Sequence, residues 1–301
     1  MRMTTKLREL MASEKVPWSM AAYDGLTAKL VCEAGYDVIA AGGTSIAAGL
    51  GLPDVELYSV TENLHATRNI VAASTVPVIA DIDTGYGNAI NVMRTVREFE
   101  QIGCAGLILE DQVSPKICPA MGDAEILPLE QALGKVRAAL AARTDPDFVI
   151  VARTDAVDVD EACRRVKAFG EAGADMVFTV NKCSKSIADL RKIRKAAGVP
   201  IKLHLMGWVE ELTYDEIKSV AGVAGWGFPT LFTVVAALRS NLAAIHKTKS
   251  TQSLPIPMTA LQDFKSFIGF PEIEKLMDEY MPAPAPAEAR PPQDAASKAV
   301  A

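Results

Sequence analysis

Residues 76–110, VPVIADIDTGYGNAINVMRTVREFEQIGCAGLILE, decide the fold of this chain. The stretch starts with an apolar run at 76–82, continues with a helical pattern of apolar positions over 88–102, and returns to an apolar run at 105–110. This order is typical of two parallel strands that are joined by a crossing helix. The rest of the chain repeats the same unit.

Working outward from this stretch gives eight strand–helix units. Strands are expected at 17–23, 37–42, 76–82, 105–110, 148–153, 174–180, 199–205 and 223–228. Helices are expected at 25–34, 60–73, 88–102, 129–143, 159–172, 185–197, 213–221 and 229–246. Eight such units in about 250 residues favour an α/β fold of the (β/α)8 barrel type over an open doubly wound sheet.

The sequence predicts three parts: a barrel domain over 1–250, a helical extension over 251–281, and a mobile tail rich in proline and alanine over 282–301. The extension carries an apolar stripe from Phe264 to Met277 that lies outside the completed barrel. Something must cover this stripe, either the chain's own barrel or a neighbouring subunit.

Composition excludes several classes of function. The chain has 301 residues, with 31 Lys and Arg against 37 Asp and Glu, so its net charge of −6 gives no general attraction for nucleic acid or an anionic membrane. The basic stretch 182–195 is interpreted as the solvated face of a helix. No apolar run is long enough to cross a bilayer, and the five scattered cysteines fit neither a disulfide framework nor a zinc site. We therefore expect a cytoplasmic protein.

Acidic residues follow several of the expected strands. Asp81 and Asp83 lie two apart on one strand and so point to the same face, while Glu110 ends the next strand and Asp54 lies in a nearby loop. An all-oxygen set of this kind suits Mg²⁺, or alternatively Mn²⁺. The other interpretation is a carboxylate cluster that backbone amides and Arg153 satisfy without a metal ion.

The loop after the fourth strand carries Lys116 and Cys118. A cysteine close to a lysine can act as an acid or a nucleophile, but an ordinary surface cysteine explains the spacing as well. The nearby stretch 84–88, TGYGN, has glycines but matches neither common phosphate-binding motif. A nucleotide site is therefore not expected.

Five segments together resemble the isocitrate lyase/phosphoenolpyruvate mutase superfamily. They are YDGLTAKL (23–30), GLPD (51–54), ADIDTGYGN (80–88), EDQVSPKIC (110–118) and ARTDA (152–156). The likeness is strongest to the branch of 2-methylisocitrate lyase, dimethylmalate lyase and carboxyphosphonoenolpyruvate mutase. It implies a (β/α)8 barrel, Mg²⁺, a carboxylate ligand with an α-oxygen, and a homotetramer whose last helix is exchanged between subunits.

The resemblance also implies roles for individual residues. Asp83 would bind the metal directly, with Asp81, Asp54 and Glu110 holding it directly or through water. Substrate-binding positions would be Arg153, Tyr23, Asp24 and the backbone amides of Gly42 and Gly43. Lys116 and Cys118 match the gate loop of the lyases, in which the cysteine protonates the enolate of the product.

The chain departs from the family pattern on the far side of the expected pocket. Pro119 and Ala120 replace the Gly-His that follows the cysteine in the lyases, and His204 stands where an asparagine is expected. Val180, Trp208, Trp226 and Phe228 offer apolar side chains in place of charged ones, although such aromatic residues also serve as core. We expect a substrate whose distal group is less charged than that of methylisocitrate.

These observations predict a Mg²⁺-dependent carbon–carbon lyase that cleaves a 2-hydroxy or 2-oxo acid through an enolate, with Tyr23 or His204 as the base and Cys118 as the acid. The alternatives are an oxaloacetate-type decarboxylase, a hydrolase or mutase of acyl or phosphonopyruvate, and a barrel that binds a carboxylate without catalysis. The sequence does not decide among substrates.

Overall fold

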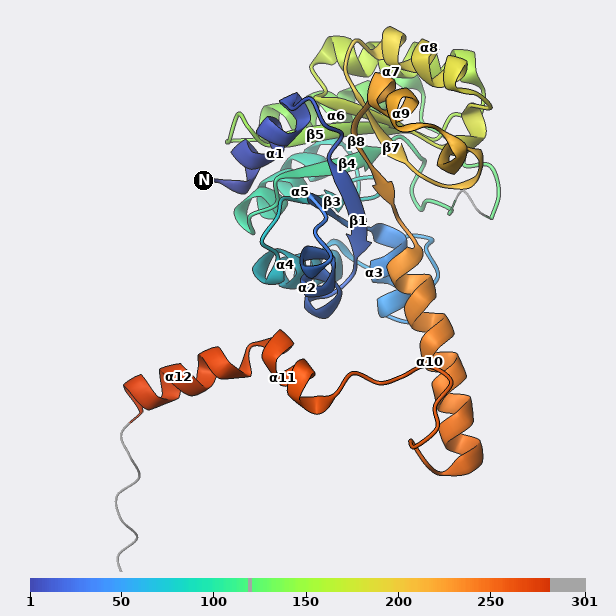
Figure 1. The fold of residues 1–301 in the computed structure, drawn as a ribbon. Helices are drawn as coiled ribbons and strands as arrows, with labels where there is room; N and C mark the ends of the chain where they lie inside the picture. The colour runs from blue at the N-terminus through green and yellow to red at the C-terminus, as the bar shows by residue number, and fades with distance from the viewer. Residues whose placement is uncertain (119–120, 282–301) are drawn as a thin grey trace, which may run out of the picture. The chain divides into compact units, whose positions relative to one another are not determined.

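The computed structural model describes residues 1–118 and 121–281. Its centre is a closed barrel of parallel strands, each hydrogen-bonded to the next, with the last strand paired to the first. The strands are β1 (Trp18–Ala22), β2 (Val38–Ala41), β3 (Val78–Asp81), β4 (Gly106–Glu110), β5 (Val149–Thr154), β6 (Met176–Thr179), β7 (Ile201–His204) and β8 (Ala221–Trp226) (Figure 1). The predicted fold class is confirmed.

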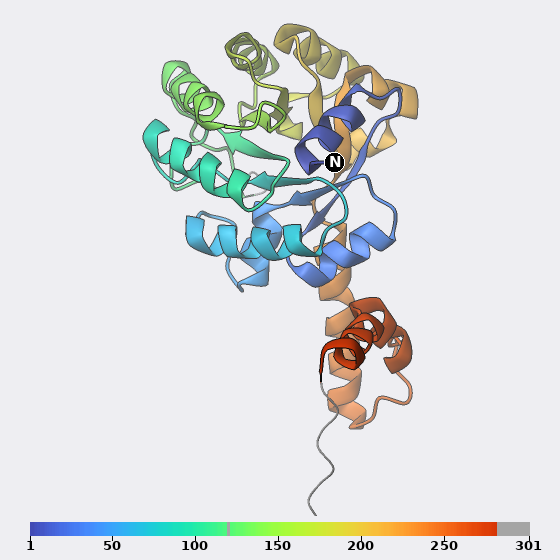
Figure 2. The same cartoon turned by 90° about the vertical axis from the view of Figure 1, so that its left-hand side faces the viewer.

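Helices surround the strands, as Figure 2 shows. Those that connect β1 through β8 as crossings are α2 (Gly25–Glu33), α4 (Val60–Ala73), α5 (Ala89–Gln101), α6 (Leu129–Ala142), α7 (Val159–Ala172), α8 (Ile187–Ala197) and α9 (Tyr214–Val220), and α10 (Pro229–Thr248) follows β8. The sequence did not predict α1 (Met3–Ala12), α3 (Gly43–Gly49) or the 3₁₀ turns η1 (Asn181–Cys183) and η2 (Gly207–Glu211).

Helix α7 shows how the sequence sets these bounds. The side chain of Asp158 caps its first turn by accepting hydrogen bonds from the backbone N–H groups of Asp160 and Glu161. The buried residues Val166 and Phe169 form its inner face. Gly173 ends the helix with φ of 105°, a conformation that glycine adopts without strain.

The barrel interior is filled in layers. The part nearer the amino ends of the strands is apolar and contains Val38, Ile79, Ile108, Val149, Val151, Met176 and Val223. Because side chains alternate along a strand, the next inward positions toward the carboxyl ends of β3 to β6 are Asp81, Glu110, Arg153 and Phe178. Polar chemistry therefore begins directly above an apolar floor, at the end of the barrel where sites of this fold are found.

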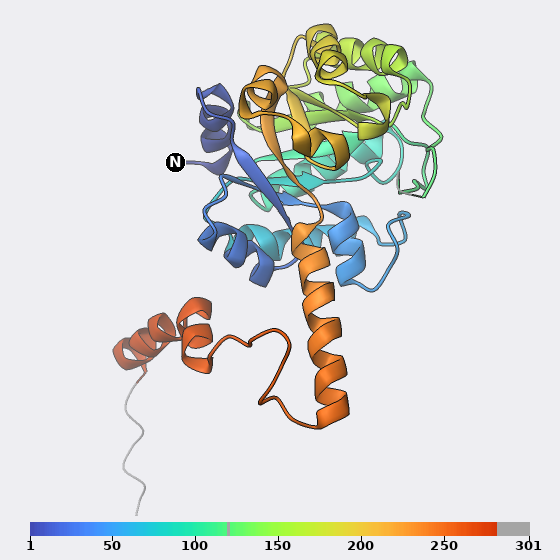
Figure 3. The same cartoon turned by 45° about the vertical axis from the view of Figure 1, so that its right-hand side comes forward.

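The C-terminal region forms its own compact unit. Clustering of contacts divides the chain between Val235 and Ala236, inside α10, which is one uninterrupted helix in Figure 3. The second unit continues with α11 (Leu261–Ile268) and α12 (Phe270–Tyr280). The predicted tail at 282–301 lies outside the described residues.

None of the helices among the described residues is both long enough and apolar enough to cross a membrane.

Candidate active site

Three acidic residues meet around one ammonium group at the carboxyl end of the barrel. The Nζ atom of Lys116 lies 2.9 Å from Oδ1 of Asp54 and also pairs with Oδ1 of Asp83. The hydroxyl of Tyr58 donates to the other oxygen of Asp83 at 2.6 Å, and the backbone N–H of Asp83 donates to Asp81 at 3.1 Å. The structure thus brings together four residues that the sequence selected and adds Tyr58, which it did not.

Gly43 makes room for this cluster. A Cβ atom at that position would lie 2.9 Å from Oδ1 of Asp83, 3.1 Å from the hydroxyl of Tyr58 and 3.3 Å from Oδ2 of Asp81. Real Cβ atoms do not approach neighbours so closely without displacing them. The glycine is therefore needed for space at this point.

Burial and charge act against each other on these groups. Burial raises the pKa of Asp83 to about 6 although Lys116 acts to lower it, while Asp81 adds to the rise. Burial alone would lower the pKa of Lys116, but the surrounding carboxylates reverse this effect, Glu110 and Asp83 most strongly, and raise it well above its usual value. Lys116 is therefore a firmly charged ammonium at neutral pH.

Arg153 forms a second centre on β5. Its guanidinium lies 2.8 Å from Glu110 and 2.7 Å from Asp155, and its Cζ atom lies 5.2 Å from the centre of the Phe178 ring. Burial raises the pKa of Glu110 well above its usual value even though Arg153 and Lys116 act to lower it. The Nε atom of Arg153 is buried without a hydrogen-bond partner among the described residues, so the guanidinium keeps a donor for a ligand.

The donor atoms fit a hard divalent cation in kind. Oδ1 of Asp54 and Oδ1 of Asp83 are buried and face the Lys116 ammonium, and Oε2 of Glu110 faces Arg153. Apart from these ion pairs, the three oxygens and Oε1 of Glu110 accept no hydrogen bond from the described residues. The carboxyl groups of the site also outnumber the cations of Lys116 and Arg153. As placed, no three His, Cys, Asp or Glu side chains in the described part of the chain are grouped as metal ligands. The metal roles of Asp54, Asp81, Asp83 and Glu110 stay predictions.

Glu56 fastens the gate loop, and sequence reasoning missed it. One oxygen of its carboxylate accepts from the hydroxyl of Thr84 at 2.5 Å, and the other accepts from the hydroxyl of Ser114 at 2.7 Å and the backbone N–H of Lys116 at 2.9 Å. Three loops, after β2, β3 and β4, therefore meet at one side chain. The only sequence feature that could have pointed to Glu56 is its position two residues after Asp54, a candidate metal ligand.

Cys118 follows in the same loop as a half-buried free thiol. The N–H of Ile117 donates to the side-chain oxygen of Gln112 at 3.0 Å, and the backbone carbonyl of Cys118 accepts from Met121 at 2.8 Å. These bonds anchor the backbone and leave the thiol without a structural role of its own. Pro119 and Ala120 lie outside the described residues.

His204 lies at the end of β7 and is neutral. Its Nε2 atom accepts the backbone N–H of Gly227 at 3.2 Å, so its proton resides on Nδ1. Burial lowers the pKa of His204 to about 3, and the charges of Lys202 and Arg153 act in the same direction. The imidazole is thus arranged to donate a hydrogen bond, which weakens its expected role as a base.

Two residues near β1 have local roles. Asp24 caps α2, accepting from the backbone N–H of Thr27 at 2.7 Å and from its hydroxyl at 2.9 Å, which uses its carboxylate for folding. Tyr23 is half-buried against the core, and burial followed by the charge of Asp24 raises its pKa. A phenol with a raised pKa keeps its proton at neutral pH and donates.

The residues of the expected apolar wall have contacts of different kinds, and their role in the pocket stays a prediction. Trp208 in η2 packs against the outer core and donates from Nε1 to the carbonyl of Ser184 at 3.0 Å. Trp226 stacks on Trp18 at 5.6 Å and donates to Glu210. Both tryptophans contribute to the packing between strands and helices. Trp226 does so from an outward position of β8. Val180 is buried directly after β6, and Phe228 lies 5.5 Å from the His204 ring.

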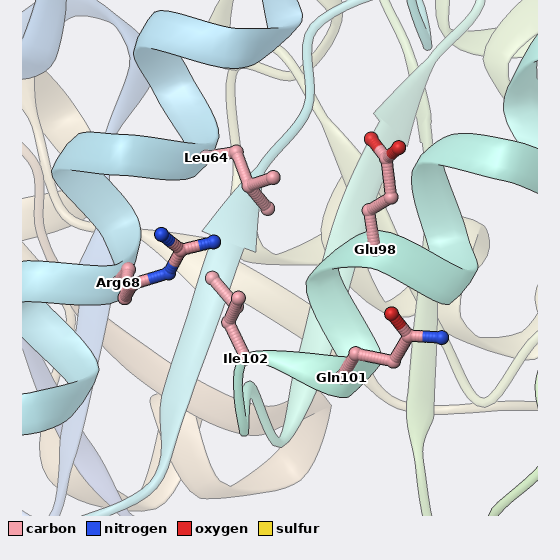
Figure 4. A pocket seen from close by; sticks show the side chains of 5 residues that line it. All are labelled: Leu64, Arg68, Glu98, Gln101 and Ile102. Atoms are coloured by element: carbon pink, nitrogen blue, oxygen red, sulfur yellow. The ribbon is translucent and has the colours of Figure 1, made fainter.

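A surface crevice lies elsewhere, between α4 and α5 on the outer helical layer. It measures about 570 Å³ and is lined by Leu64, Arg68, Glu98, Gln101 and Ile102 (Figure 4). None of these residues touches the acidic cluster through a hydrogen bond or ion pair recorded for the described chain. The crevice is separate from the chemistry of the barrel mouth.

Comparison with known sequences gives one consistent result. A family model described as phosphoenolpyruvate phosphomutase matches residues 7–249. The 2,3-dimethylmalate lyase of Eubacterium barkeri is 35% identical over 287 residues, which cover 93% of this chain and 99% of that protein. An oxaloacetate decarboxylase of Bradyrhizobium diazoefficiens is 33% identical over 267 residues, covering 87% of this chain and 88% of its own.

Solved structures agree. Phosphoenolpyruvate phosphomutase from Streptomyces platensis subsp. rosaceus superposes with a TM-score of 0.85 at 29% identity, covering 92% of this chain and 99% of the other. A phosphonopyruvate hydrolase in complex with oxalate and Mg²⁺ superposes with a TM-score of 0.84 at 29% identity, covering 94% and 100%. The expected enzyme of the lyase type is confirmed, and the chain belongs to the phosphoenolpyruvate mutase/isocitrate lyase superfamily.

Proposed function

We propose that this protein is a Mg²⁺-dependent lyase that breaks a carbon–carbon bond of a 2-hydroxy or 2-oxo carboxylic acid through an enolate. The observation that carries the proposal is the cluster of Asp54, Asp81 and Asp83 beside the Arg153–Glu110 pair, with Lys116 reaching into it from the loop that also carries Cys118. We further propose that the substrate carries less charge than methylisocitrate, because Thr179 and Val180 follow Phe178 at the end of β6.

Asp83, Asp54 and Glu110 would hold the metal ion through the buried oxygens that face Lys116 and Arg153 here, and Asp81 would hold it directly or through water. When bound, Mg²⁺ supplies a Lewis acid that offsets negative charge on the α-oxygen of the substrate. Lys116 neutralises part of the same cluster from the gate loop. Arg153 binds the substrate carboxylate with its free donor and is held in place by Glu110 and Asp155.

The remaining residues handle protons and water. The backbone N–H groups of Gly42 and Gly43 lie at the start of α3 and orient the carboxylate. His204, whose Nε2 accepts from the backbone N–H of Gly227, would donate to the substrate from Nδ1. Cys118 protonates the carbon of the enolate while its loop excludes water. Tyr23 would line the carboxylate site, as the resemblance implies.

Replacing Cys118 with alanine tests the role of the acid. We expect Cys118→Ala to lower turnover by about 10²-fold to 10⁴-fold, since general acid catalysis contributes on that order, while the affinity for Mg²⁺ stays unchanged in calorimetry. Cys163→Ala, which removes another half-buried free thiol, is the matched control and should keep its turnover. Normal turnover by Cys118→Ala would contradict the assignment.

A second candidate is decarboxylation of an oxaloacetate-like acid. Cleavage of a hydroxy acid needs a base for the hydroxyl proton, but His204 uses Nε2 to accept from Gly227 and the pKa of Tyr23 is raised. Loss of carbon dioxide from a 2-oxo acid needs no such base. A panel of 2-oxo and 2-hydroxy acids, with products identified by mass, distinguishes the two candidates.

We also propose that the chain forms a homotetramer in which the C-terminal helices are exchanged between subunits. Helices α11 and α12 bury no residue, and they expose Phe264, Phe270, Ile273, Leu276 and Met277. Apolar faces of this extent are normally covered.

A further inference from the structure

Lys202 is a charged residue in the barrel interior to which neither the fold nor the proposed chemistry assigns a role. Its register partner on β8 is Val223, which belongs to the interior cluster, whereas its neighbours Ile201 and Leu203 belong to the outer core. The side chain of Lys202 therefore faces into the barrel. The residue is only 6% exposed.

The ammonium of Lys202 lacks the partners that the other buried cations have. Lys116 and Arg153 pair with carboxylates of the site, Arg165 pairs with Asp111, and Lys135 donates to the carbonyl of Thr84. For Lys202 the described part of the chain shows neither an ion pair nor a hydrogen bond, and its Nζ atom lies over the Phe178 ring. A largely buried ammonium that no carboxylate pairs with is costly, so such a group points to a ligand that supplies the opposite charge.

The group is still charged near neutral pH. Burial lowers the pKa of Lys202 to about 8, Arg153 acts in the same direction, and Asp81 opposes the shift. Because this value lies above 7, the ammonium form dominates at neutral pH. The cost of burying it is therefore present when the enzyme meets its substrate.

Phe178 connects Lys202 with the substrate site. The Nζ atom of Lys202 and the Cζ atom of Arg153 each lie 5.2 Å from the centre of the Phe178 ring. The ring of His204 meets the same phenylalanine edge-on at 6.4 Å. Both cations therefore contact the same ring, which brings the Lys202 ammonium close to the guanidinium expected to bind the substrate carboxylate.

We infer that Lys202 binds a second anionic group of the substrate, at the end opposite the carboxylate held by Arg153. The inference rests on the proposed function and narrows its substrate class to short dicarboxylic oxo or hydroxy acids. Such a substrate still carries less charge than methylisocitrate. Lys202 is then a specificity residue, since an acid with an uncharged far end leaves its ammonium unpaired.

The variant Lys202→Met tests this, since methionine keeps much of the length and removes the charge. Lys185→Met, which removes an exposed lysine after η1, is the matched control. Without ligand, removal of an unpaired buried charge should raise the melting temperature by about 2–4 °C, whereas the control should not change it. An unchanged or lower melting temperature for Lys202→Met would show that the ammonium has a partner in the free protein and would overturn the inference.

Two probes, each measured by calorimetry with Mg²⁺, separate the two ends of the site. Oxalate carries only the group expected at Arg153, whereas 3,3-difluorooxalacetate, an inhibitor of a solved relative, also carries a far carboxylate. Lys202→Met should bind the longer probe about 10-fold to 100-fold more weakly and bind oxalate within about 2-fold of the wild type.

The outcomes distinguish the inference from the proposal beneath it. If the wild type binds both probes and Lys202→Met weakens both equally or neither, the inference fails and the proposed function stands. If the wild type binds neither probe, the proposed function fails and the inference fails with it.

Discussion

At the scale of single residues, the space beside Gly43 decides whether the acidic cluster can form. A methyl group there would approach Asp83 and Tyr58, whereas a Cβ atom on Gly42 would meet only Ala21 and Ser45, both at 3.8 Å. We expect Gly43→Ala to weaken Mg²⁺ binding by about 10-fold to 100-fold, as displaced supporting contacts do, and Gly42→Ala to leave it within about 2-fold. Calorimetry measures both. Equal effects of the two variants would contradict the steric argument.

His204 should make the stability of the protein sensitive to acid. The unfolded chain binds a proton on this histidine near pH 6.5, but the native state binds it only near pH 3, so stability decreases as the pH falls through this window. Between pH 7 and pH 5 the wild type should lose about 2 kcal/mol more unfolding free energy than His204→Gln. Urea denaturation at the two pH values measures the difference, and a gap that stays constant would contradict the prediction.

Single residues also mark where prediction from the sequence ends. Asp54, Asp81, Asp83 and Arg153 were found because strand ends of a parallel barrel meet at one edge, which chain order reveals. Glu56 and Lys202 were missed, since their significance depends on which loop or strand lies opposite. For Trp208, which follows β7 in a loop, the periodicity of the sequence does not set the direction of the side chain, so its contacts could not be predicted.

At the scale of elements, Arg165 joins α7 to the loop after β4. This buried residue lies 3.0 Å from Asp111 and 2.6 Å from Glu161, whereas its neighbour Arg164 pairs with Glu161 at the surface. We expect Arg165→Met to reduce the unfolding free energy by about 3–5 kcal/mol because Asp111 is left buried without its cation. The control Arg164→Met should cost less than about 1 kcal/mol in the same urea titration. Similar losses of unfolding free energy in the two variants would contradict the prediction that the buried Arg165–Asp111 pair contributes more to stability than the surface pair.

Most elements followed from hydrophobic pattern. Helices α4 and α7 begin and end at the predicted residues because capping side chains or glycines mark their ends. Helix α1 was missed because no side chain caps its first turn, and α3 because it is short and starts at two glycines. The predicted extension is divided into α11 and α12 at Gly269, whose φ is 102°.

At the scale of the whole molecule, the exposed apolar faces of α11 and α12 predict association. In the double variant Phe264→Glu/Ile273→Glu, the mass measured by light scattering should shift from that of a tetramer to that of smaller species. The reason is that the interface would then have to bury two carboxylates in place of apolar side chains. Lys275→Glu, an exposed polar position of α12, is the control and should keep the wild-type mass. A wild type and a double variant of identical mass would refute the assembly.

Three charged groups of the site are almost completely buried. Asp83 is 0%, Glu110 2% and Lys116 3% exposed. Because Glu56 holds Ser114 and the backbone of Lys116, we expect an ion or a small acid to reach these groups when those hydrogen bonds open. The observed rate of ligand association should therefore reach a plateau as the ligand concentration rises, and the plateau should equal the rate at which these hydrogen bonds open. A substitution at Glu56 that weakens the bonds should raise the plateau rate.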